Sequence, residues 1–506
     1  MAAVVFLPLV LLVLAAFASV HGDRDFIAAV YQHAPYDARD DRPPIDVWKR
    51  NLDIYEEQTR IASRKKADII VFPEVGLTGN FKTLMAFSRD KLQALSSECP
   101  DPELENWTPC DQPKLYKAYP LARLSCMAQE NSIYVVADLI TSHSCVGEHG
   151  CPADDRYSRN TAVVFDRTGK LILRYFKTHL FFESINNSPR EPQIPVFDTD
   201  FGRFGLCICF DSVFKFPIVD LIQKAGIKNV LFLTFWVDAL QPALPWQQGF
   251  AAGNNVNFFA SNTHGPVTTG GGIFSGKDVL ASSHGETALQ IATVPVAGPS
   301  KGDHGHKCNQ CGCTESDPAA KYKFRPEPED TFLRQSQIFA KVMKFTPLVS
   351  NHDTLTICDN DLCCTLSYKI RANPNEELYA FGIASGLNAL NESSLIPTKK
   401  PNLQHKLFGQ ICALMKCPEQ DRSKCGTFSL DATTTFDNFD ISGNFSSQSM
   451  YPSVVNSGMT FPESDEWHHC STCGRLWSEN GTKRPLVAAY FLGRAYERDE
   501  LDPRQQ

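Results

Sequence analysis

The chain has 506 residues, of which 43% are hydrophobic and 21% charged, and these are the proportions of a globular protein. Its formal net charge of −8 at pH 7 argues against a nucleic acid or an anionic membrane as a partner. A chain of this length predicts two domains, each with its own core.

The N-terminus predicts export. Residues 4–17 are almost wholly apolar, and small and polar residues follow up to Gly22. This pattern is typical of a signal peptide, so we expect residues 1–22 to be removed and the protein to be secreted and extracellular. A membrane anchor is the alternative, but the run is short for one. No later segment offers the roughly 18 uninterrupted apolar residues of a membrane span.

Strand and helix patterns alternate over the first 300 residues, which is typical of a layered α/β domain. A helix is predicted to open at Pro43 and Pro44, and a hairpin to turn at residues 167–169. The other predicted helices cover residues 115–131, 218–225 and 246–254, and the predicted strands cover 26–32, 68–74, 133–140, 160–166, 170–176, 203–210, 229–235 and 257–264.

The character of the chain changes near residue 300. A Gly- and Cys-rich junction (301–313) is followed by short strand-like pieces such as 353–359 and 363–370. We therefore predict a first domain over residues 23–300 and a second, disulfide-rich, mostly β domain over 301–506.

The 18 cysteines fit an oxidising compartment. Cys145 and Cys151 bracket a short loop and are predicted to pair, and Cys99 with Cys110 is a second plausible local pair. Glycosylation sequons support export, and they lie at Asn106, Asn186, Asn391, Asn444 and Asn480.

Two cysteine clusters have spacing that zinc would also suit. One is Cys308, Cys311 and Cys313 after His304 and His306, and the other is Cys470 and Cys473 after His468 and His469. An oxidising compartment favours disulfides at such positions, so we predict no metal and no cofactor.

Three predicted strands end in residues that together suit catalysis: Glu74, Lys177 and Cys209. A cysteine at a strand tip before a helix is held rigidly, and the helix N-terminus favours its thiolate. A carboxylate nearby would take the thiol proton, and an ammonium would stabilise an oxyanion. Each residue also has a plainer interpretation: a packed thiol, a turn acid and a solvated strand-end cation.

Two further residues are candidates for the same site. Glu183 follows Lys177 in a loop and either positions that lysine or is an ordinary loop charge. Trp236 follows a buried strand and either lines a substrate pocket or packs in a domain seam. Asp211 is expected to cap the turn after Cys209, and Cys207 to be a packing residue.

The segments VFPEVGLTG, RYFKTHLFFE and FGLCICFD resemble, in order and spacing, the three motifs of the nitrilase superfamily of carbon–nitrogen hydrolases. The segments FIAAVYQHA, CPADDRYSRNTAVVFD and VNFFASNTH are similar to its vanin and biotinidase branch. The resemblance covers most of residues 24–300. It implies an α/β fold, a nitrilase-like αββα sandwich, followed by a disulfide-rich, mostly β C-terminal base domain. It also implies that Glu74 is the general base, Lys177 the cationic stabiliser and Cys209 the nucleophile.

The substrate that the resemblance implies is a small linear secondary amide, with pantetheine leading and biotinyl-lysine as the alternative. Residues 75–78 and Asn80 depart from the branch pattern beside the base, so they bear on the substrate. A hypothesis of another class is a secreted, non-catalytic binding protein on the same scaffold. Transfer of the acyl group to an amine is a third. The sequence predicts no oligomeric state.

Overall fold

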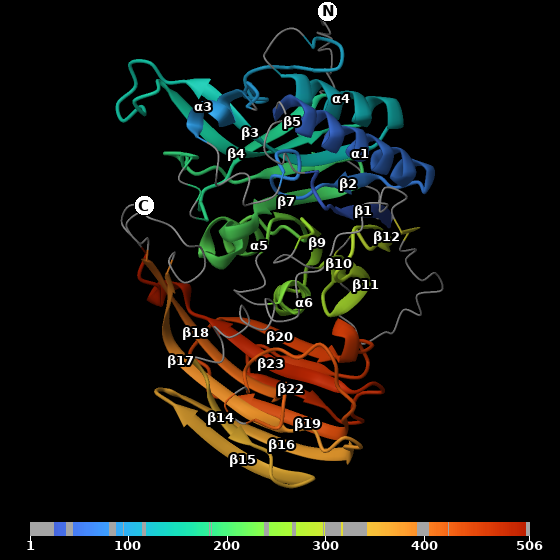
Figure 1. Cartoon of the computed structure of the whole chain (residues 1–506), viewed down its shortest axis with the longest axis vertical. Helices are drawn as coiled ribbons and strands as arrows, with labels where there is room; N and C mark the ends of the chain where they lie inside the picture. Colours follow the sequence, from blue (N-terminus) through green and yellow to red (C-terminus); the bar gives the residue numbers. More distant parts are fainter. Residues whose placement is uncertain are drawn as a thin grey trace, which may run out of the picture.

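The computed structural model describes residues 25–36, 44–79, 88–94, 96–113, 118–181, 183, 185–236, 242–265, 270–296, 298, 315–316, 342–391, 404–421, 423 and 425–501. The predicted signal peptide and the cluster from His304 to Cys313 lie outside these residues. Figure 1 shows the described elements as stacked layers, with two sheets and their helices above and a β-sandwich below.

The first sheet has seven strands in the order β13-β12-β1-β2-β3-β4-β5. β1, β2 and β3 run parallel, whereas β4 and β5 form an antiparallel hairpin. The bounds are β1 (Phe26–Gln32), β2 (Ile69–Val71), β3 (Tyr134–Ser144), β4 (Arg156–Phe165), β5 (Leu171–Phe176), β12 (Ala288–Val294) and β13 (Glu315–Ser316).

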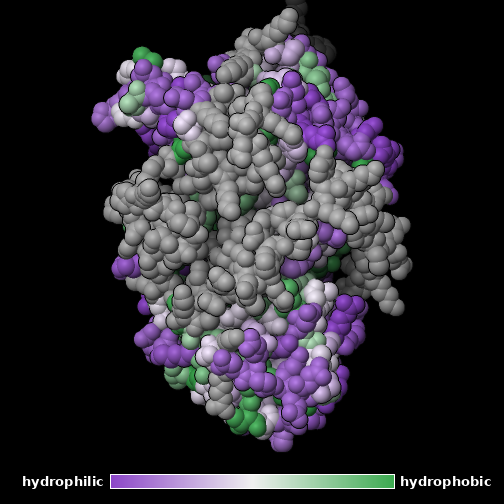
Figure 2. Space-filling model, in the orientation of Figure 1, coloured by the Kyte–Doolittle hydropathy of each residue, from purple (hydrophilic) through white to green (hydrophobic). Residues whose placement is uncertain are grey.

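Helices α1 (Pro44–Arg64) and α4 (Tyr119–Asn131) cover the outer face of this sheet, and the short α3 (Arg89–Ala94) lies near the hairpin of β3 and β4. Trp48, Leu52 and Tyr55 of α1 share one face and pack in the same cluster as Leu121 and Leu124 of α4. The opposite face of each helix meets solvent, and Figure 2 shows that surface as mostly hydrophilic.

The second sheet has six strands in the order β11-β10-β9-β8-β7-β6, of which β7, β8 and β9 run parallel. All six residues of β8 are buried, as expected for a strand covered on both faces. The bounds are β6 (Val196–Thr199), β7 (Gly202–Ile208), β8 (Asn229–Thr234), β9 (Asn257–Asn262), β10 (Gly271–Ser275) and β11 (Asp278–Ser283), with helices α5 (Asp220–Gln223) and α6 (Ala243–Asn254) on the outer side.

The two sheets pack face to face through an apolar cluster that joins Phe26 and Ile69 of one sheet to Leu206 and Phe259 of the other. Helix, sheet, sheet and helix therefore form four layers, and the αββα sandwich that the resemblance implied is confirmed. Both parallel sets of strands have polar residues beyond their carboxyl ends, and these ends hold the site described below.

The C-terminal part is a sandwich of two five-stranded sheets, ordered β14-β17-β18-β23-β20 and β15-β16-β19-β22-β21. A disulfide between Cys364 of β16 and Cys412 of β18 joins them through the apolar core. The mostly β, disulfide-rich character that the sequence predicted is confirmed. The bounds are β14 (Lys344–Pro347), β15 (His352–Asp359), β16 (Leu362–Ala372), β17 (Tyr379–Asn391), β18 (Gln404–Lys416), β19 (Thr435–Gly443), β20 (Ser449–Asn456), β21 (His468–Cys470), β22 (Arg475–Ser478) and β23 (Leu486–Arg494).

Helix α6 lies directly against β20 and joins the two parts of the molecule (Figure 1). Gly249 and Gly253 permit this approach, because a Cβ on Gly253 would lie 1.9 Å from the Met450 carbonyl oxygen. Tyr451 of β20 extends into the aromatic cluster of the upper domain, with its ring centroid 5.3 Å from that of Phe250. The sandwich therefore shares a core with the outer face of the six-stranded sheet.

Cysteine pairing corrects one prediction. Cys145 pairs with Cys151 as predicted, but Cys110 pairs with Cys126 of α4 and Cys99 is unpaired. The loop with Cys110 lies on α4, where the Cys110 amide donates to the Ser125 hydroxyl, so the helix supplies the nearer partner. Six disulfides form among the described cysteines, which is consistent with an extracellular protein.

Other predictions differ in extent. The helix predicted over 218–225 is present but ends two residues earlier: a π-helical turn (Lys215–Val219) leads into α5, which ends at Gln223. The strand predicted over 68–74 ends at Val71. Strands β10, β11 and β12 were not predicted. Within the described part of the chain, none of the helices combines the length and the apolar character that crossing a bilayer requires.

Candidate active site

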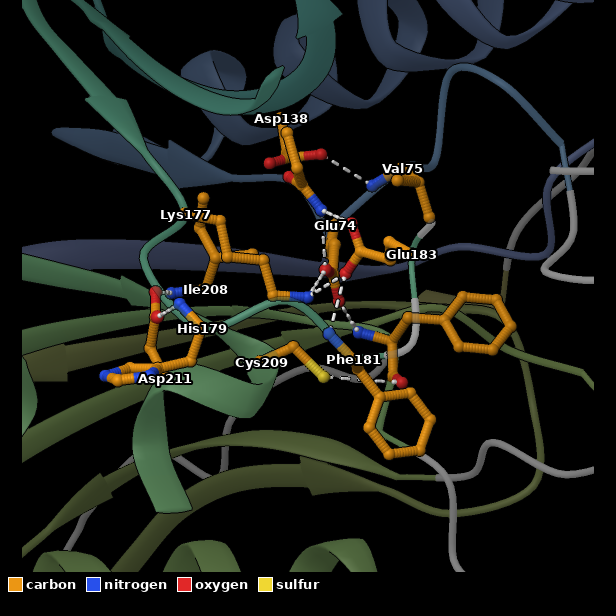
Figure 3. Close-up of polar contacts among 12 residues, drawn as sticks. Glu74, Val75, Asp138, Lys177, His179, Phe181, Glu183, Ile208, Cys209 and Asp211 are labelled. Atoms are coloured by element: carbon orange, nitrogen blue, oxygen red, sulfur yellow. Dashed lines mark hydrogen bonds and ion pairs between the residues drawn. The ribbon is translucent and has the colours of Figure 1, made fainter. Parts of the chain in front are cut away.

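The three predicted catalytic residues converge beyond the strand ends, at the seam between the two sheets (Figure 3). Glu74 follows β2, and Lys177 follows β5, which runs in the same direction as β2 and β3. Cys209 follows β7, and Phe235 follows its parallel neighbour β8. Carboxyl ends of parallel strands share one edge of a sheet, and this brings residues distant in sequence together.

Lys177 lies between two carboxylates. Its Nζ is 2.6 Å from Glu74 Oε1 and also donates to Glu183 Oε1, and all three side chains are buried. Burial acts to lower the pKa of Lys177, but Glu183 and then Glu74 outweigh it and hold that pKa well above its usual value. Lys177 is therefore a permanent cation, and the third of its N–H bonds is left for another acceptor.

Asn160 of β4 completes this cluster, and it was not singled out from the sequence. Its Nδ2 donates to Glu74 Oε1 at 2.9 Å and to Glu183 Oε2 at 3.0 Å, and its side chain is 1% exposed. It thus bridges the two carboxylates, as Lys177 does. A usable signal was present, since Asn160 opens the apolar run NTAVVF, and a polar residue in a buried strand generally has a fixed partner.

Cys209 begins a tight turn, the nucleophile turn (Cys209–Val213), and has a φ of +41°. Such a conformation is strained for a residue with a side chain, so the surroundings must hold it. Burial, and then the Glu74 carboxylate, raise the pKa of Cys209 well above its usual value, while Lys177 opposes the rise. At neutral pH Cys209 is a thiol, and it needs a base to react.

Asp211 holds the nucleophile turn from within, as expected of a capping residue. Its carboxylate accepts from the Ile208 amide at 3.2 Å, the His179 amide at 2.8 Å and the Tyr175 hydroxyl at 2.9 Å. Burial raises the pKa of Asp211 to about 7, and the hydrogen bonds, led by that of His179, act against the rise. These contacts tie the turn to the chain beyond β5, which carries Lys177.

The backbone of Phe235 lies between Glu74 and Cys209 and contacts both. The Phe235 amide donates to Glu74 Oε2 at 2.8 Å, and the Phe235 carbonyl accepts from Cys209 Sγ at 3.5 Å. Among the described residues no hydrogen bond links Cys209 directly to Glu74. Each of the two side chains is nevertheless held by the backbone of the same residue, which sets their relative position.

A third buried carboxyl, Asp138 of β3, lies behind Glu74. Its Oδ1 accepts from the Val75 amide at 2.8 Å, and its Oδ2 has no hydrogen-bond partner among the described residues. Burial, and then the charge of Glu74, raise the pKa of Asp138 well above its usual range. This carboxyl holds Val75, whose φ of +46° is unusual for a β-branched residue.

The remaining predicted residues are placed as follows. Glu183 joins the cluster, whereas the Trp236 ring stacks on Trp246 of α6 at 4.5 Å and is 2% exposed. Trp236 thus belongs to the aromatic cluster on the outer side of the six-stranded sheet. Its role in lining a substrate pocket stays a prediction.

The sequons also differ in their surroundings. Asn186 is buried, and its Nδ2 donates to Glu183 Oε2 at 3.0 Å, so glycosylation there stays a prediction that requires this contact to be broken. Asn106, Asn444 and Asn480 are exposed, and the side chain of Asn391 lies outside the described part. Of the two zinc-like clusters, Cys470 and Cys473 form a disulfide. No group of metal-binding side chains occurs within the described ranges.

Comparison with known proteins gives matches along most of the chain. Residues 27–277 match the carbon-nitrogen hydrolase family, and residues 332–499 match the vanin C-terminal domain. Pantetheinase from Bos taurus is 34% identical over 487 residues, which cover 94% of this chain and 90% of that protein. Biotinidase from Takifugu rubripes is 32% identical over 506 residues, which cover 94% of this chain and 95% of that protein. Among solved structures, an amidase from Nesterenkonia sp. is 20% identical with a TM-score of 0.39, covering 53% of this chain and 90% of its own.

Proposed function

This chain belongs to the nitrilase superfamily of carbon–nitrogen hydrolases, in the branch of the pantetheinases and biotinidases, and is therefore a hydrolase of carbon–nitrogen bonds in amides. We propose that it is secreted and that it cleaves a linear secondary amide through a thioester on Cys209. The observation that carries the mechanism is the position of Lys177, buried between Glu74 and Glu183 beside the strand-end cysteine.

In the first step, Glu74 takes the Cys209 proton as the thiol attacks the amide carbonyl. The negative charge of Glu74 moves to the acyl oxygen, and both positions lie in the field of Lys177. The total charge of the cluster therefore stays constant, and the third N–H of Lys177 is left to donate to the developing oxyanion.

In the second step, Glu74 returns its proton to the leaving amine, and the C–N bond breaks to leave a thioester. Water, deprotonated by the same carboxylate, then releases the acid and restores the thiol. Glu183 keeps its charge throughout. It holds Lys177 protonated while Glu74 is neutral, and this is the role we propose for it.

Pantetheine is the proposed substrate, giving pantothenate and cysteamine, and biotinyl-lysine is the alternative. The names of the relatives support both, and their identities to this chain are nearly equal. Val75, with its left-handed backbone beside the base, belongs to the segment that departs from the branch pattern. Differences there bear on which acyl group is accepted.

The test is the release of cysteamine from pantetheine by the purified secreted protein, with biotinyl-lysine assayed in parallel. Cys209→Ala removes the nucleophile, and Cys207→Ala is the matched control, because Cys207 is a buried thiol of the same strand in the outer-face cluster. We expect turnover of pantetheine by the wild type and by Cys207→Ala, and none by Cys209→Ala.

The other outcomes are equally informative. Turnover of biotinyl-lysine alone would replace the proposed substrate and keep the mechanism. Formation of a new amide when an amine is added would indicate acyl transfer. Activity that persists in Cys209→Ala would contradict the thioester route.

A further inference from the structure

Arg494, at the end of β23, carries a guanidinium from the C-terminal sandwich to the nucleophile turn. Its Nη2 donates to the Val213 carbonyl oxygen at 3.0 Å, a contact between residues 281 positions apart in the chain. Val213 is the last residue of the turn that begins at Cys209. Arg494 is 8% exposed, so the contact is shielded from water.

Contacts within the C-terminal part hold the Arg494 guanidinium in place. Asp499 accepts from it at 2.8 and 3.1 Å, and the Phe408 carbonyl accepts a further bond. The guanidinium carbon lies 4.7 Å from the centre of the Tyr496 ring. All these partners belong to the C-terminal part. The planar guanidinium, held by several hydrogen bonds, therefore presents one N–H to Val213 in a nearly fixed orientation.

The nucleophile turn needs such support at its far end. Asp211 and the Ser212 hydroxyl, which donates to the Cys209 carbonyl at 2.7 Å, hold its beginning and its interior. The carbonyls at the end of a helical turn have no partner within it. Among the described residues, Arg494 supplies the partner for the Val213 carbonyl from the C-terminal sandwich.

We infer that Arg494 is a positioning residue of the C-terminal sandwich that fixes the nucleophile turn and, through it, the Cys209 thiol. The inference rests on the proposed function of Cys209. It assigns the sandwich a part in the reaction, in addition to its contribution to stability. Displacement of the thiol by a fraction of an ångström lowers the rate of attack, and binding of substrate elsewhere in the site is unaffected.

The test compares Arg494→Gln and Arg494→Lys with Lys277→Met. Lys277, in the β10–β11 hairpin, donates to the Trp467 carbonyl at 3.3 Å and so makes a second contact between the two parts, on the side away from α5 (Figure 1). The readouts are kcat, KM, the thermal midpoint, and hydrogen exchange of the peptide that spans residues 206–214.

We expect Arg494→Gln to lower kcat on the order of ten-fold with KM nearly unchanged, and to speed exchange in residues 209–214. Arg494→Lys should recover part of both, because an ammonium still donates to the Val213 carbonyl. Lys277→Met should alter neither kcat nor exchange in the nucleophile turn.

Wild-type kcat together with wild-type exchange in Arg494→Gln, even with a lowered thermal midpoint, would overturn the inference and leave Arg494 as a docking contact. If Arg494→Gln does not fold, Asp499→Asn frees the same guanidinium, and the same readouts decide. Exchange needs no substrate. A wild type that hydrolyses neither amide would therefore refute the proposed substrates, and the comparison of exchange would still test Arg494.

Discussion

Lys177 binds two carboxylates, one from Glu74, which precedes it in the chain, and one from Glu183, which follows it. Glu74 changes charge during the proposed reaction and Glu183 does not, although both bind the same Nζ. Asn160 binds both carboxylates with one neutral amide, so it limits their repulsion and adds no charge. The charge of each buried group is therefore a testable property.

Asn160→Asp would place a third carboxylate among the other two. We expect kcat to fall about 100-fold or more at pH 7, because like charges in a buried site oppose ionisation of one another. Asn160→Ala should lower kcat less, about ten-fold, since it removes two hydrogen bonds and leaves the net charge unchanged. Steady-state kinetics from pH 5 to 8 checks this, with Asn131→Asp on α4 as control. An Asn160→Asp variant as active as Asn160→Ala would contradict the charge argument.

Asp138 tests the opposite case. Since the pKa of Asp138 is raised in the folded chain, folding favours its protonated form, and stability falls as the pH rises above the unfolded pKa. Asp138→Asn has the same shape and needs no proton. We expect it to keep kcat within a few-fold and to be at least as stable as the wild type at pH 8, in thermal melts.

Glu183→Gln should lower kcat about 100-fold, because it removes the charge that we propose holds Lys177 protonated.

At the scale of elements, the ends of β1 and β9 meet beside the turn that carries Glu74. The His33 amide donates to the Asn262 carbonyl, and the His264 amide donates to the His33 carbonyl. The buried His33 ring lies 3.1 Å from Asn51 Oδ1 of α1. Burial lowers the pKa of His33 to about 4, against its hydrogen bond with Asn51, so the ring is neutral in the folded chain.

This junction predicts a loss of stability in acid. Above the unfolded value of about 6.5 His33 is neutral in both states; as the pH falls from there toward about 4, only the unfolded chain takes up the proton. Thermal midpoints measured from pH 8 to pH 4 should therefore fall in this window. His33→Gln should show a shallower fall, even if its midpoint at pH 8 is lower. An equally steep fall in both proteins would assign the acid sensitivity to other groups.

At the scale of the whole molecule, α6 is the element on which both domains depend. It covers the six-stranded sheet with one side and meets β20 with the other. Arg494 adds a polar contact at the nucleophile turn. The interface therefore combines a close backbone approach, aromatic packing and one buried cation.

Gly253→Ala tests the close approach. In a helix without tertiary contacts, this change stabilises by about 1 kcal/mol, because glycine is a poor helix former. Here the added carbon would lie 1.9 Å from the Met450 carbonyl oxygen, so α6 and β20 must separate. We expect a lower thermal midpoint, measured by calorimetry or fluorescence. A higher midpoint would show that the two elements have room to move apart at no cost.

Much of the upper domain follows from the sequence, for identifiable reasons. Buried strands such as β8 are continuous apolar runs, and the resemblance of three motifs placed Glu74, Lys177 and Cys209 in one site. The contacts that the sequence did not reveal are made by backbone groups or span long separations. The Phe235 backbone groups carry no residue-specific signal, and Val213 contacts Arg494 across 281 residues.

Cys209 stands on one sheet, whereas Glu74 and Lys177 stand on the other, so the cluster has no existence in either sheet by itself. A chain that has formed only one sheet is therefore latent: it has a thiol without a base, or a base without a thiol. Because pairing distant segments is the slow part of folding, activity should return later than secondary structure during refolding. Such latency would keep a partly folded hydrolase from cleaving amides before both sheets have formed.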